Sequence, residues 1–250
     1  PVLSGFQMSY AGPGSDAFVV KFNSAGSRVW ATFYGGSAGD MGQSIATDIA
    51  GNVYITGSTA SSNFPVLSGF QMAFAGGSFL WDAFLIKFSS AGTLTWATYY
   101  GGGNDDFGQG ITTDIAGSIY ITGYTKSVNF PVLAGFQMVY GGGGAWGGDA
   151  FVVKFSPAGT LTWATYYGGN DDEEGKSIVT DITGNVYITG FTNSANFPVL
   201  GGFQMVFGGG GSTCGDAFVV KFSSAGTLIW ATFFGGSADE WGWDIAADGK

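Results

Sequence analysis

Gly51-Asn52-Val53-Tyr54-Ile55-Thr56-Gly57 is a short apolar run between two glycines, and it decides how the chain folds. Nearly the same run returns at residues 117–123 and 184–190. A second motif, Pro-Val-Leu, a small residue and then Gly-Phe-Gln-Met, begins at residues 1, 65, 131 and 198, so its spacings are 64, 66 and 67 residues. The chain is therefore a repeat protein in which the second motif occurs four times and the first only three times.

The composition fits a folded array of small β units. Of the 250 residues, 45% are hydrophobic, 17% are aromatic and only 10% are charged, and 46 are glycines that predict many tight turns. Chains this rich in aromatic residues are not disordered. No apolar run reaches the length of about 18 residues that a membrane-spanning helix needs, so no membrane span is expected. The formal net charge of −10 would repel phosphate groups, which argues against nucleic acid as a partner.

Two residue types narrow the functional classes further. Histidine is absent, which excludes Ser-His-Asp and Cys-His catalysis and any zinc or haem site with histidine ligands. Cys214 is the single cysteine, so no disulfide can form within the chain, and we treat it as incidental. The sequence begins at Pro1, inside a repeat and without a visible signal peptide, so we expect a processed or excised part of a longer polypeptide.

One repeat is predicted to form four antiparallel strands, named A to D. Residues 43–48 and 52–56 flank a glycine turn and predict an A–B hairpin. A longer segment, residues 58–80, precedes strand C at residues 82–88, and strand D follows at residues 93–100. Short runs of β-branched and aromatic residues between glycines favour strands over helices. An acidic loop then leads from strand D to the next strand A.

Strand C indicates how these sheets are arranged. Phe84, Ile86 and Phe88 point to one face while Ala83 and Leu85 point to the other, so both faces are apolar. Sheets covered on both faces must stack against similar sheets, which predicts a β-propeller. One tryptophan per repeat lies on strand D and is expected to be buried between blades; these are Trp30, Trp96, Trp163 and Trp230.

We therefore predict an all-β fold, a β-propeller of four-stranded antiparallel blades in about four repeats of about 66 residues. Residues 1–250 form one array of repeats 1–64, 65–130, 131–197 and 198–250. The array is expected to open with strands C and D and to end with a strand A at residues 243–248. Fifteen strands are thus predicted, and the last repeat lacks strand B. We expect the gap to be filled by further blades or by strand addition from a neighbouring chain.

The combined motif also resembles a known family. The pattern Ile-x2-Asp-x2-Gly-Asn-Val-Tyr-Ile-Thr-Gly-x-Thr-x-Ser-x-Asn-Phe-Pro, followed by Asp-Ala-Phe-Val-Val-Lys-Phe, is similar to the bacterial β-propeller repeats called SBBP repeats. The resemblance covers essentially the whole chain. It implies a propeller that is usually part of a large secreted or surface protein, mostly without an assigned biochemical activity.

The candidate contact face follows from the strand order. In a four-stranded meander the B–C and D–A connections emerge on the same face, which we expect to contact a protein or glycan partner. Its carboxylates are hypothetical calcium ligands or a docking patch for a cationic partner, because hard cations prefer clustered oxygen ligands. The calcium candidates are Asp105, Asp106, Asp171, Asp172 and Glu173, and Asp40, Glu174, Asp239 and Glu240 accompany them. Alternatively these are solvated turn residues; no other cofactor is expected.

Two more acidic columns recur and are predicted to be structural. An aspartate begins each strand C and is expected to cap a turn, while a lysine five residues later faces the other way and is exposed or pairs with a neighbouring blade. An aspartate at each A–B turn is expected to bond backbone amides. The three columns are Asp16, Asp82, Asp149 and Asp216; Lys21, Lys87, Lys154 and Lys221; and Asp48, Asp114, Asp181 and Asp248.

Aromatic side chains of the loops are the remaining binding candidates. One per B–C segment is expected either to pack over the glycine-rich loop or to stack on sugar rings: Tyr10, Phe74, Tyr140 and Phe207. Four tryptophans do not recur in register and are lectin candidates or loop anchors: Trp81, Trp146, Trp241 and Trp243.

The favoured function is a non-catalytic binding or structural module at the cell surface or outside the cell. The alternative is a subunit of an extracellular filament or matrix, which would associate with itself through the incomplete blade. A glycan-acting enzyme with a carboxylate pair such as Asp171 and Asp172 ranks last.

Overall fold

The computed structural model describes residues 2–76, 80–144, 147–210 and 215–248. Within these residues the chain forms fourteen strands and no helix. The strands are β1 (Ala17–Phe22), β2 (Arg28–Tyr34), β3 (Asp40–Thr47), β4 (Val53–Thr59), β5 (Asp82–Phe88), β6 (Leu94–Tyr100), β7 (Asp106–Thr113), β8 (Ile119–Thr125), β9 (Asp149–Phe155), β10 (Leu161–Tyr167), β11 (Glu173–Thr180), β12 (Val186–Thr192), β13 (Asp216–Phe222) and β14 (Leu228–Phe234).

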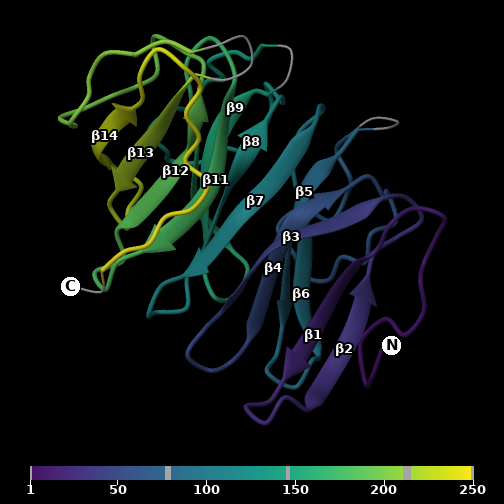
Figure 1. The fold of residues 1–250 in the computed structure, drawn as a ribbon. Helices are drawn as coiled ribbons and strands as arrows, with labels where there is room; N and C mark the ends of the chain where they lie inside the picture. The colour runs from purple at the N-terminus through teal and green to yellow at the C-terminus, as the bar shows by residue number, and fades with distance from the viewer. Residues whose placement is uncertain (1, 77–79, 145–146, 211–214, 249–250) are drawn as a thin grey trace.

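These strands form three four-stranded sheets and one hairpin (Figure 1). The sheets are blade I (β3 to β6), blade II (β7 to β10) and blade III (β11 to β14), and the hairpin β1–β2 is the half-blade. Consecutive strands pair antiparallel, so each blade follows the predicted order A, B, C and D. The prediction of an all-β fold built from four-stranded antiparallel blades is confirmed.

Repeat units and blades are offset from each other. Residues 65–130, for example, contain strands β5 and β6 of blade I and strands β7 and β8 of blade II. Each blade therefore takes its A and B strands from one repeat unit and its C and D strands from the next.

The A–B hairpin turns as the glycine predicts. Gly51, Gly117 and Gly184 have φ angles of 75°, 79° and 78°, a left-handed conformation that glycine adopts at little cost. Strand A begins earlier than expected, at Asp40 in β3. It also contains a β-bulge, because the register shifts between Gly42 and Ser44 and leaves the residue between them unpaired.

The hydrophobic core lies between blades. Every residue of strand β5 except Lys87 is buried, which confirms that both faces of strand C are covered. Trp30, Trp96 and Trp163 are buried as predicted. Trp230 on β14 is only half-buried, because none of the described residues forms a further blade over it.

The long B–C segment closes the outer edge of each blade, which the sequence did not predict. In blade I, Leu67 and Ala97 exchange backbone hydrogen bonds of 2.9 and 3.0 Å, and the Tyr99 N–H donates to the Gln71 carbonyl at 3.1 Å. Equivalent bridges join Leu3 to Ala31, Leu133 to Ala164 and Leu200 to Ala231. We call residues 2–8, 65–72, 131–138 and 198–205 the rim segments. They pair with strand D, the edge strand, and so protect its backbone.

The expected fifteenth strand is not formed. Residues 243–248 lie in the innermost position of a next blade, where the Gly242 N–H donates to the Gly190 carbonyl at 3.1 Å and the Ser177 hydroxyl donates to Asp244 at 2.7 Å. They are not a strand because no strand B pairs with them among the described residues. The prediction of a strand A at this place was wrong.

The array is open. Inner strands β3, β7 and β11 pack side by side, while neither β1 nor β2 packs against blade III. The half-blade and blade III lie at opposite ends of the array (Figure 1).

Candidate functional site

The B–C and D–A connections meet on one face, as the strand order predicts. The Ser37 and Gly103 N–H groups donate to the side-chain oxygens of Asn63 and Asn129, each at 2.8 Å. Each of these bonds joins a D–A loop to the B–C segment of the following blade. This loop face is therefore held together by an asparagine that recurs in three repeats, as Asn63, Asn129 and Asn196.

The first acidic column of the loop face is buried. Asp106 begins β7 and accepts hydrogen bonds from the Gly102 N–H at 2.7 Å, from the Ser127 hydroxyl at 3.0 Å and from the Thr125 hydroxyl. Asp40 in blade I has the same three kinds of donor. Glu173 in blade III is likewise buried. These carboxyls fasten the D–A loop to the following A and B strands.

The aspartate that begins strand C holds the B–C segment. Asp82 is buried and accepts the backbone N–H groups of Ala75 at 2.9 Å and Gly76 at 3.0 Å, and the amide of Gln71 also donates to it. Gln71 in turn accepts the Gly101 N–H at 3.1 Å. The predicted turn-capping role of this column is confirmed, and it extends to the rim segment.

These two columns form a buried carboxyl pair at each blade junction. A Cβ built on Gly101 would lie 2.6 Å from Asp106 Oδ2 and 2.9 Å from Asp82 Cγ, so both carboxyls flank one glycine. Burial raises the pKa of Asp82 to about 6, although the loop amides favour its charged form. Burial also raises the pKa of Asp106 to about 7, with a further contribution from the charge of Asp82. Only glycine leaves room for the pair.

The next junction repeats this arrangement with Asp149 and Glu173. Burial raises the pKa of Asp149 to about 7 and the pKa of Glu173 to about 8, and the charge of Asp149 adds to the second shift. A Cβ on Gly168 would lie 2.3 Å from Glu173 Oε2 and 2.9 Å from Asp149 Cγ.

The calcium candidates do not converge on one point. Asp171 is exposed and accepts the Asp172 N–H at 2.9 Å, while Asp172 is buried and accepts the Gly144 N–H at 2.5 Å. Asp105 accepts the Trp81 N–H at 3.2 Å. In the part of the chain that the structure describes, no three acidic or cysteine side chains are grouped as metal ligands. Calcium binding therefore stays a prediction, and no set of converging ligands among the described residues supports it.

The acidic patch is smaller on the surface than the sequence indicates. Four of its nine carboxylates, Asp40, Asp106, Asp172 and Glu173, are buried and hold loops instead of facing solvent. The sequence did not predict this burial, because each of these residues directly follows a loop. Each one is nevertheless either the first residue of strand A or the residue immediately before it.

The lysines and the A–B turn aspartates are structural, as predicted. Lys87 donates to the carbonyl of Pro157 in the next blade at 3.0 Å and lies 5.2 Å above the ring centre of Tyr54. Asp48 accepts the Asn52 N–H at 2.9 Å and the Tyr54 hydroxyl at 3.0 Å.

The loop aromatic that recurs in each B–C segment packs against an aromatic residue of strand D, although Tyr10 is also 50% exposed. Phe74 lies against Tyr99 with ring centres 5.6 Å apart, and Tyr10, Tyr140 and Phe207 have equivalent partners on strand D. Trp81 stacks on Phe107. Trp146 and Cys214 lie outside the described residues.

Trp241 and Trp243 are an exception, because they stack on each other at 5.1 Å while remaining partly exposed. The ammonium group of Lys176 lies within 5.5 Å of both ring centres. This ammonium group also pairs with Glu174.

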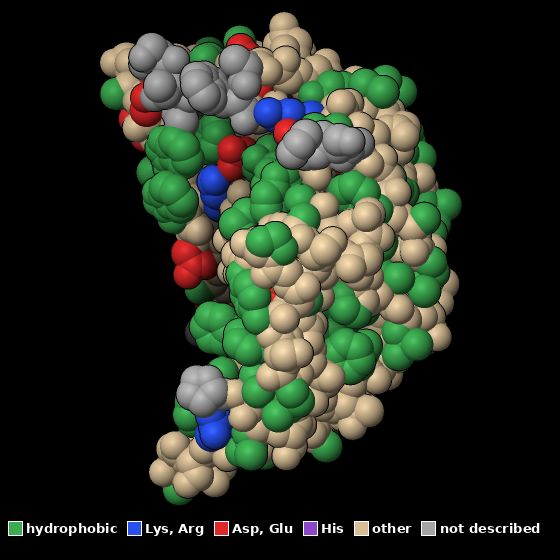
Figure 2. All heavy atoms as spheres, turned by 90° about the vertical axis from the view of Figure 1, so that its right-hand side faces the viewer, with side chains coloured by type: hydrophobic (Ala, Val, Ile, Leu, Met, Phe, Trp, Pro, Cys, Tyr) green, Lys and Arg blue, Asp and Glu red, His purple; other side chains and the backbone are tan. Residues whose placement is uncertain are grey.

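An exposed apolar surface on the rim segments was missed by sequence reasoning. Each rim segment exposes a leucine, a phenylalanine and a methionine, with exposed fractions between 38% and 52% except for Phe203 at 87%. These side chains are Leu3, Phe6 and Met8; Leu67, Phe70 and Met72; Leu133, Phe136 and Met138; and Leu200, Phe203 and Met205. Figure 2 shows a broad face rich in hydrophobic side chains, with charged side chains gathered along its left-hand margin. The sequence signal that could have predicted this surface is the rim motif itself, which contains no charged residue and recurs four times.

Comparison with known protein families agrees with this architecture. Three stretches, residues 29–65, 95–131 and 162–198, match the family described as SBBP, beta-propeller repeat. The chain carries SBBP β-propeller repeats. Each matched SBBP stretch contains strand D of one blade and strands A and B of the next, and ends at the proline of a rim motif. The family resemblance noted in the sequence is thus confirmed.

Two further comparisons, one of sequence and one of structure, gave weaker matches. The SBBP-repeat chain is 24% identical over 256 residues to an uncharacterized WD repeat-containing protein of Acanthamoeba polyphaga mimivirus. That alignment covers 89% of this chain but only 18% of the viral protein, so the chain spans less than a fifth of its relative. A crystal structure of a protein of unknown function from Bacteroides caccae is 11% identical, with a TM-score of 0.26, and the match covers 87% of this chain and 93% of that one. No described helix is long and apolar enough to cross a membrane.

Proposed function

We propose that this chain is a non-catalytic extracellular binding or structural module, with its contact surface on the B–C segments. The observation that carries this proposal is the row of exposed Leu-Phe-Met triplets, one in each rim segment. Monomeric proteins rarely expose apolar side chains in such a regular array unless another molecule covers them. The extracellular setting is what the resemblance of the repeats to those of secreted and surface proteins implies.

The rim segments are rigidly attached, so they can present these side chains without rearrangement. A Cβ on Gly69 would lie 2.4 Å from the Ala97 carbonyl oxygen, which means that the rim segment touches strand D too closely for any other residue. Gly5, Gly135 and Gly202 make the same approach. In three rim segments the phenylalanine that follows this glycine packs on the tyrosine at the end of strand D and keeps nearly half of its surface exposed; the pairs are Phe6 with Tyr34, Phe70 with Tyr100 and Phe136 with Tyr167.

The chemistry of the rim favours a protein partner. Its exposed groups are apolar and no charged residue occurs in any rim motif, so neither cations nor anions are attracted to it. Phenylalanine and methionine are enriched in the centres of protein interfaces. The acidic residues that remain exposed on the loop face, such as Asp171 and Asp239, lie outside the rim motifs and would supply a polar border.

The test compares matched pairs of substitutions. Phe70→Gln with Phe136→Gln removes two rim rings, and Met72→Gln with Met138→Gln removes two rim methionines. Ile49→Gln with Ile115→Gln is the control, because these side chains are 93% and 79% exposed but lie at A–B turns. All variants are first checked for folding by circular dichroism.

Binding is measured against a displayed peptide library and a glycan array. We expect the wild type and the A–B turn control to select apolar peptides, and both rim variants to lose this binding. Equal binding by all four proteins, or binding to glycans that rim substitution does not affect, would overturn the rim as the contact surface. Release of reducing sugar from any arrayed glycan would overturn the non-catalytic assignment.

A second candidate function is a subunit of an extracellular filament or matrix. The observation that favours it is the regular recurrence of the exposed apolar rim segments along the array.

A further inference from the structure

Each rim segment holds its methionine in the same way. The backbone N–H of the rim glycine donates to the sulfur of the methionine three residues later, at 3.2 Å between Gly69 and Met72. The same bond, at 3.3 Å, joins Gly5 to Met8, Gly135 to Met138 and Gly202 to Met205. We call these four residues the rim methionines. A thioether sulfur is a weak acceptor, so its use on the same N–H in all four rim segments shows that the sulfur has a fixed place there.

This bond lies where the rim segment turns most sharply. Leu67 exchanges backbone hydrogen bonds with Ala97, and Ser68 then takes a left-handed φ of 48°. Gly69 follows and approaches the Ala97 carbonyl so closely that a Cβ would lie 2.4 Å from its oxygen. A leucine in place of Met72 would fill similar space but could not accept the glycine N–H. The hydrogen bond is therefore a physical reason for methionine at this position.

The rim methionines are all open to solvent. Met8 is 52% exposed, Met72 48%, and Met138 and Met205 are each 45% exposed. These fractions are nearly the same in all four repeats, so the rim turn sets them and the position along the array does not. Because the glycine N–H occupies one lone pair of each sulfur, the second lone pair is left for a reagent from solvent. The rim methionines are thus four equivalent, accessible thioethers.

The fold tolerates a change at these sulfur atoms. None of the three core clusters formed by the described residues contains a methionine. An oxygen atom added to the free lone pair would point to solvent, away from strand D. It would place a polar group in a motif that has no charged residue. A chemical change at the rim methionines therefore alters the contact surface and leaves the blade interior intact.

We propose that the rim methionines are oxidation sites, and that a peroxide converts them to sulfoxides, which makes the rim polar and releases its protein partner. This regulation rests on the proposed function, in which the rim is the contact surface. Methionine sulfoxide is polar and disrupts methionine-rich interfaces, and reductases restore the thioether. The rim is accordingly a surface that oxidation switches off and reduction switches on.

The chemical step needs only the peroxide. The free lone pair of the sulfur attacks the terminal oxygen of the peroxide, so an S–O bond forms as the O–O bond breaks. The proton of that oxygen passes to the departing oxygen, which leaves as water or an alcohol. The sulfur loses two electrons and the peroxide gains them. No group of the protein has to act as an acid or a base.

The fixed hydrogen bond predicts which stereoisomer forms. A sulfoxide sulfur is chiral, and each of the two reductase classes repairs one epimer. Since the same N–H covers the same lone pair at every rim methionine, oxygen should add from the same side at all four. Met41 on β3 is the matched control, because none of the described residues donates a hydrogen bond to its sulfur. Both epimers are expected at Met41.

The first test maps the oxidation sites in the 250-residue chain. After treatment with hydrogen peroxide, peptide mass mapping should show one added oxygen on each rim methionine, and circular dichroism should be unchanged. One reductase class should then restore all four rim methionines and the other none, whereas each should restore part of the sulfoxide at Met41. Unfolding on oxidation, a rim methionine that stays unoxidised, or mixed epimers at the rim would overturn the proposal.

The second test measures release of the partner. The probes are peptides that the untreated wild type selects from the displayed library. Their binding should weaken about tenfold or more on oxidation, because a single polar group buried without a partner accounts for about that factor, and it should return after reduction. A wild type that binds these peptides equally well after full oxidation contradicts the switch, while the rim remains the contact surface.

A variant without rim sulfur isolates the cause. It carries Met8→Leu, Met72→Leu, Met138→Leu and Met205→Leu, and it keeps Met41 and Cys214, so it controls for oxidation elsewhere in the chain. Whatever its own affinity for the peptides, peroxide should not change that affinity. A loss on treatment as large as in the wild type would assign the effect to other residues and overturn the proposal.

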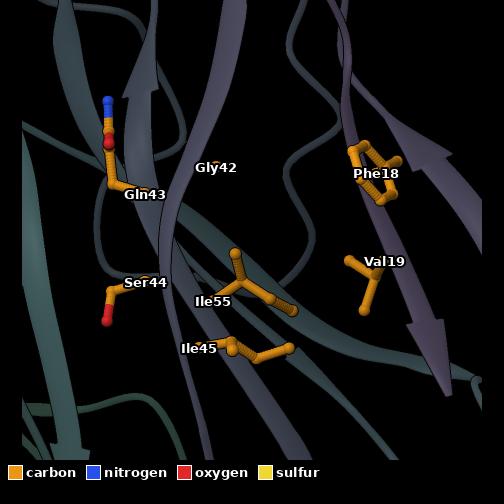
Figure 3. A pocket seen from close by; sticks show the side chains of 7 residues that line it. All are labelled: Phe18, Val19, Gly42, Gln43, Ser44, Ile45 and Ile55. Carbon is orange, nitrogen blue, oxygen red and sulfur yellow. The ribbon is translucent and has the colours of Figure 1, made fainter.

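A third readout needs no partner. Retention of the folded wild type on a hydrophobic-interaction column should fall on oxidation, and retention of the leucine variant should not. Other apolar surfaces give a constant background: Figure 3 shows one, a pocket of about 150 Å³ where Phe18 and Val19 face Ile45 and Ile55, and no sulfur lines it. Unchanged retention after full oxidation would overturn the switch.

This readout also separates the two proposals. A wild type that selects no peptide contradicts the rim as a contact surface, and with it the release of a partner. The oxidation sites are then still decided by mass mapping and by retention on the column.

Discussion

We expect the protein to lose stability as the pH rises from about 4 to about 8, because of the carboxyl pairs at the blade junctions. Burial raises the pKa of Asp82 to about 6 and that of Asp106 to about 7 in the folded chain. A group whose pKa is higher in the folded than in the unfolded chain binds its proton more tightly when folded. Its contribution is therefore fully present below the unfolded pKa, about 4, and is lost as the pH rises through the folded pKa.

The magnitude follows from the shift. For Asp106, a rise from 3.8 to about 7 corresponds to about 4 kcal/mol, at about 1.4 kcal/mol for each pKa unit. The two carboxyls of one junction share an environment, so their contributions do not add, and about 4 kcal/mol per junction is the scale we expect. For a chain of this length that amounts to roughly 10 °C in Tm. Thermal unfolding and urea unfolding at a series of pH values measure it.

A matched pair of variants isolates the cause. Asp106→Asn puts a neutral group in the buried site and should reduce the pH dependence by the contribution of that carboxyl, while Asp82, Asp149 and Glu173 keep theirs. Asp171→Asn removes the same charge from an exposed loop position and should leave the dependence unchanged. Stability that stays level or increases between about pH 5 and pH 8 would refute the reasoning. An equal response of the two variants would assign the effect to net charge instead.

Three further outcomes are expected. Trp96→Ala should lower the free energy of unfolding by about 3–5 kcal/mol in urea titrations, and Trp230→Ala by clearly less because its indole is half-exposed. Ser68→Gly should raise Tm, since Ser68 has a φ of 48° and relief of this strain contributes about 0.5–1 kcal/mol; Gly201→Ala at the equivalent place should lower Tm instead. Calcium and chelators should leave the melting curve in scanning fluorimetry unchanged, because the buried carboxylates already accept amide or hydroxyl hydrogen bonds. A chelator-sensitive rise that is lost in Asp172→Asn would instead locate a calcium site.

The fold could be predicted because its determinants are local and recur. Strand C was placed to the residue at Asp82–Phe88, since its two apolar faces and flanking turns lie within a few positions. The positive φ of the turn residue Gly51 could likewise be predicted from its residue type alone. Asp82 could be assigned a capping role because it stands directly at a strand start.

The features that were missed depend on partners far away in the sequence. Asp106 is buried because Thr125 and Ser127, about twenty residues on, surround it with hydroxyl groups. The rim segment pairs with a strand D that lies about thirty residues later in the sequence, as Leu67 does with Ala97. No local sequence pattern predicts that pairing. The absence of a strand at residues 243–248 has the same origin, because a strand needs its neighbour as well as its own sequence.

The offset between repeat units and blades has a consequence for how such arrays change in length. Since each internal unit supplies one half of two adjacent sheets, inserting or deleting one such unit adds or removes a whole blade and regenerates the same junction on either side. The offset also couples neighbours in unfolding, because neither internal unit, 65–130 or 131–197, can leave the array without breaking two sheets. Units of 64 to 67 residues can therefore be gained or lost by duplication and deletion, while each remaining blade keeps its full set of contacts.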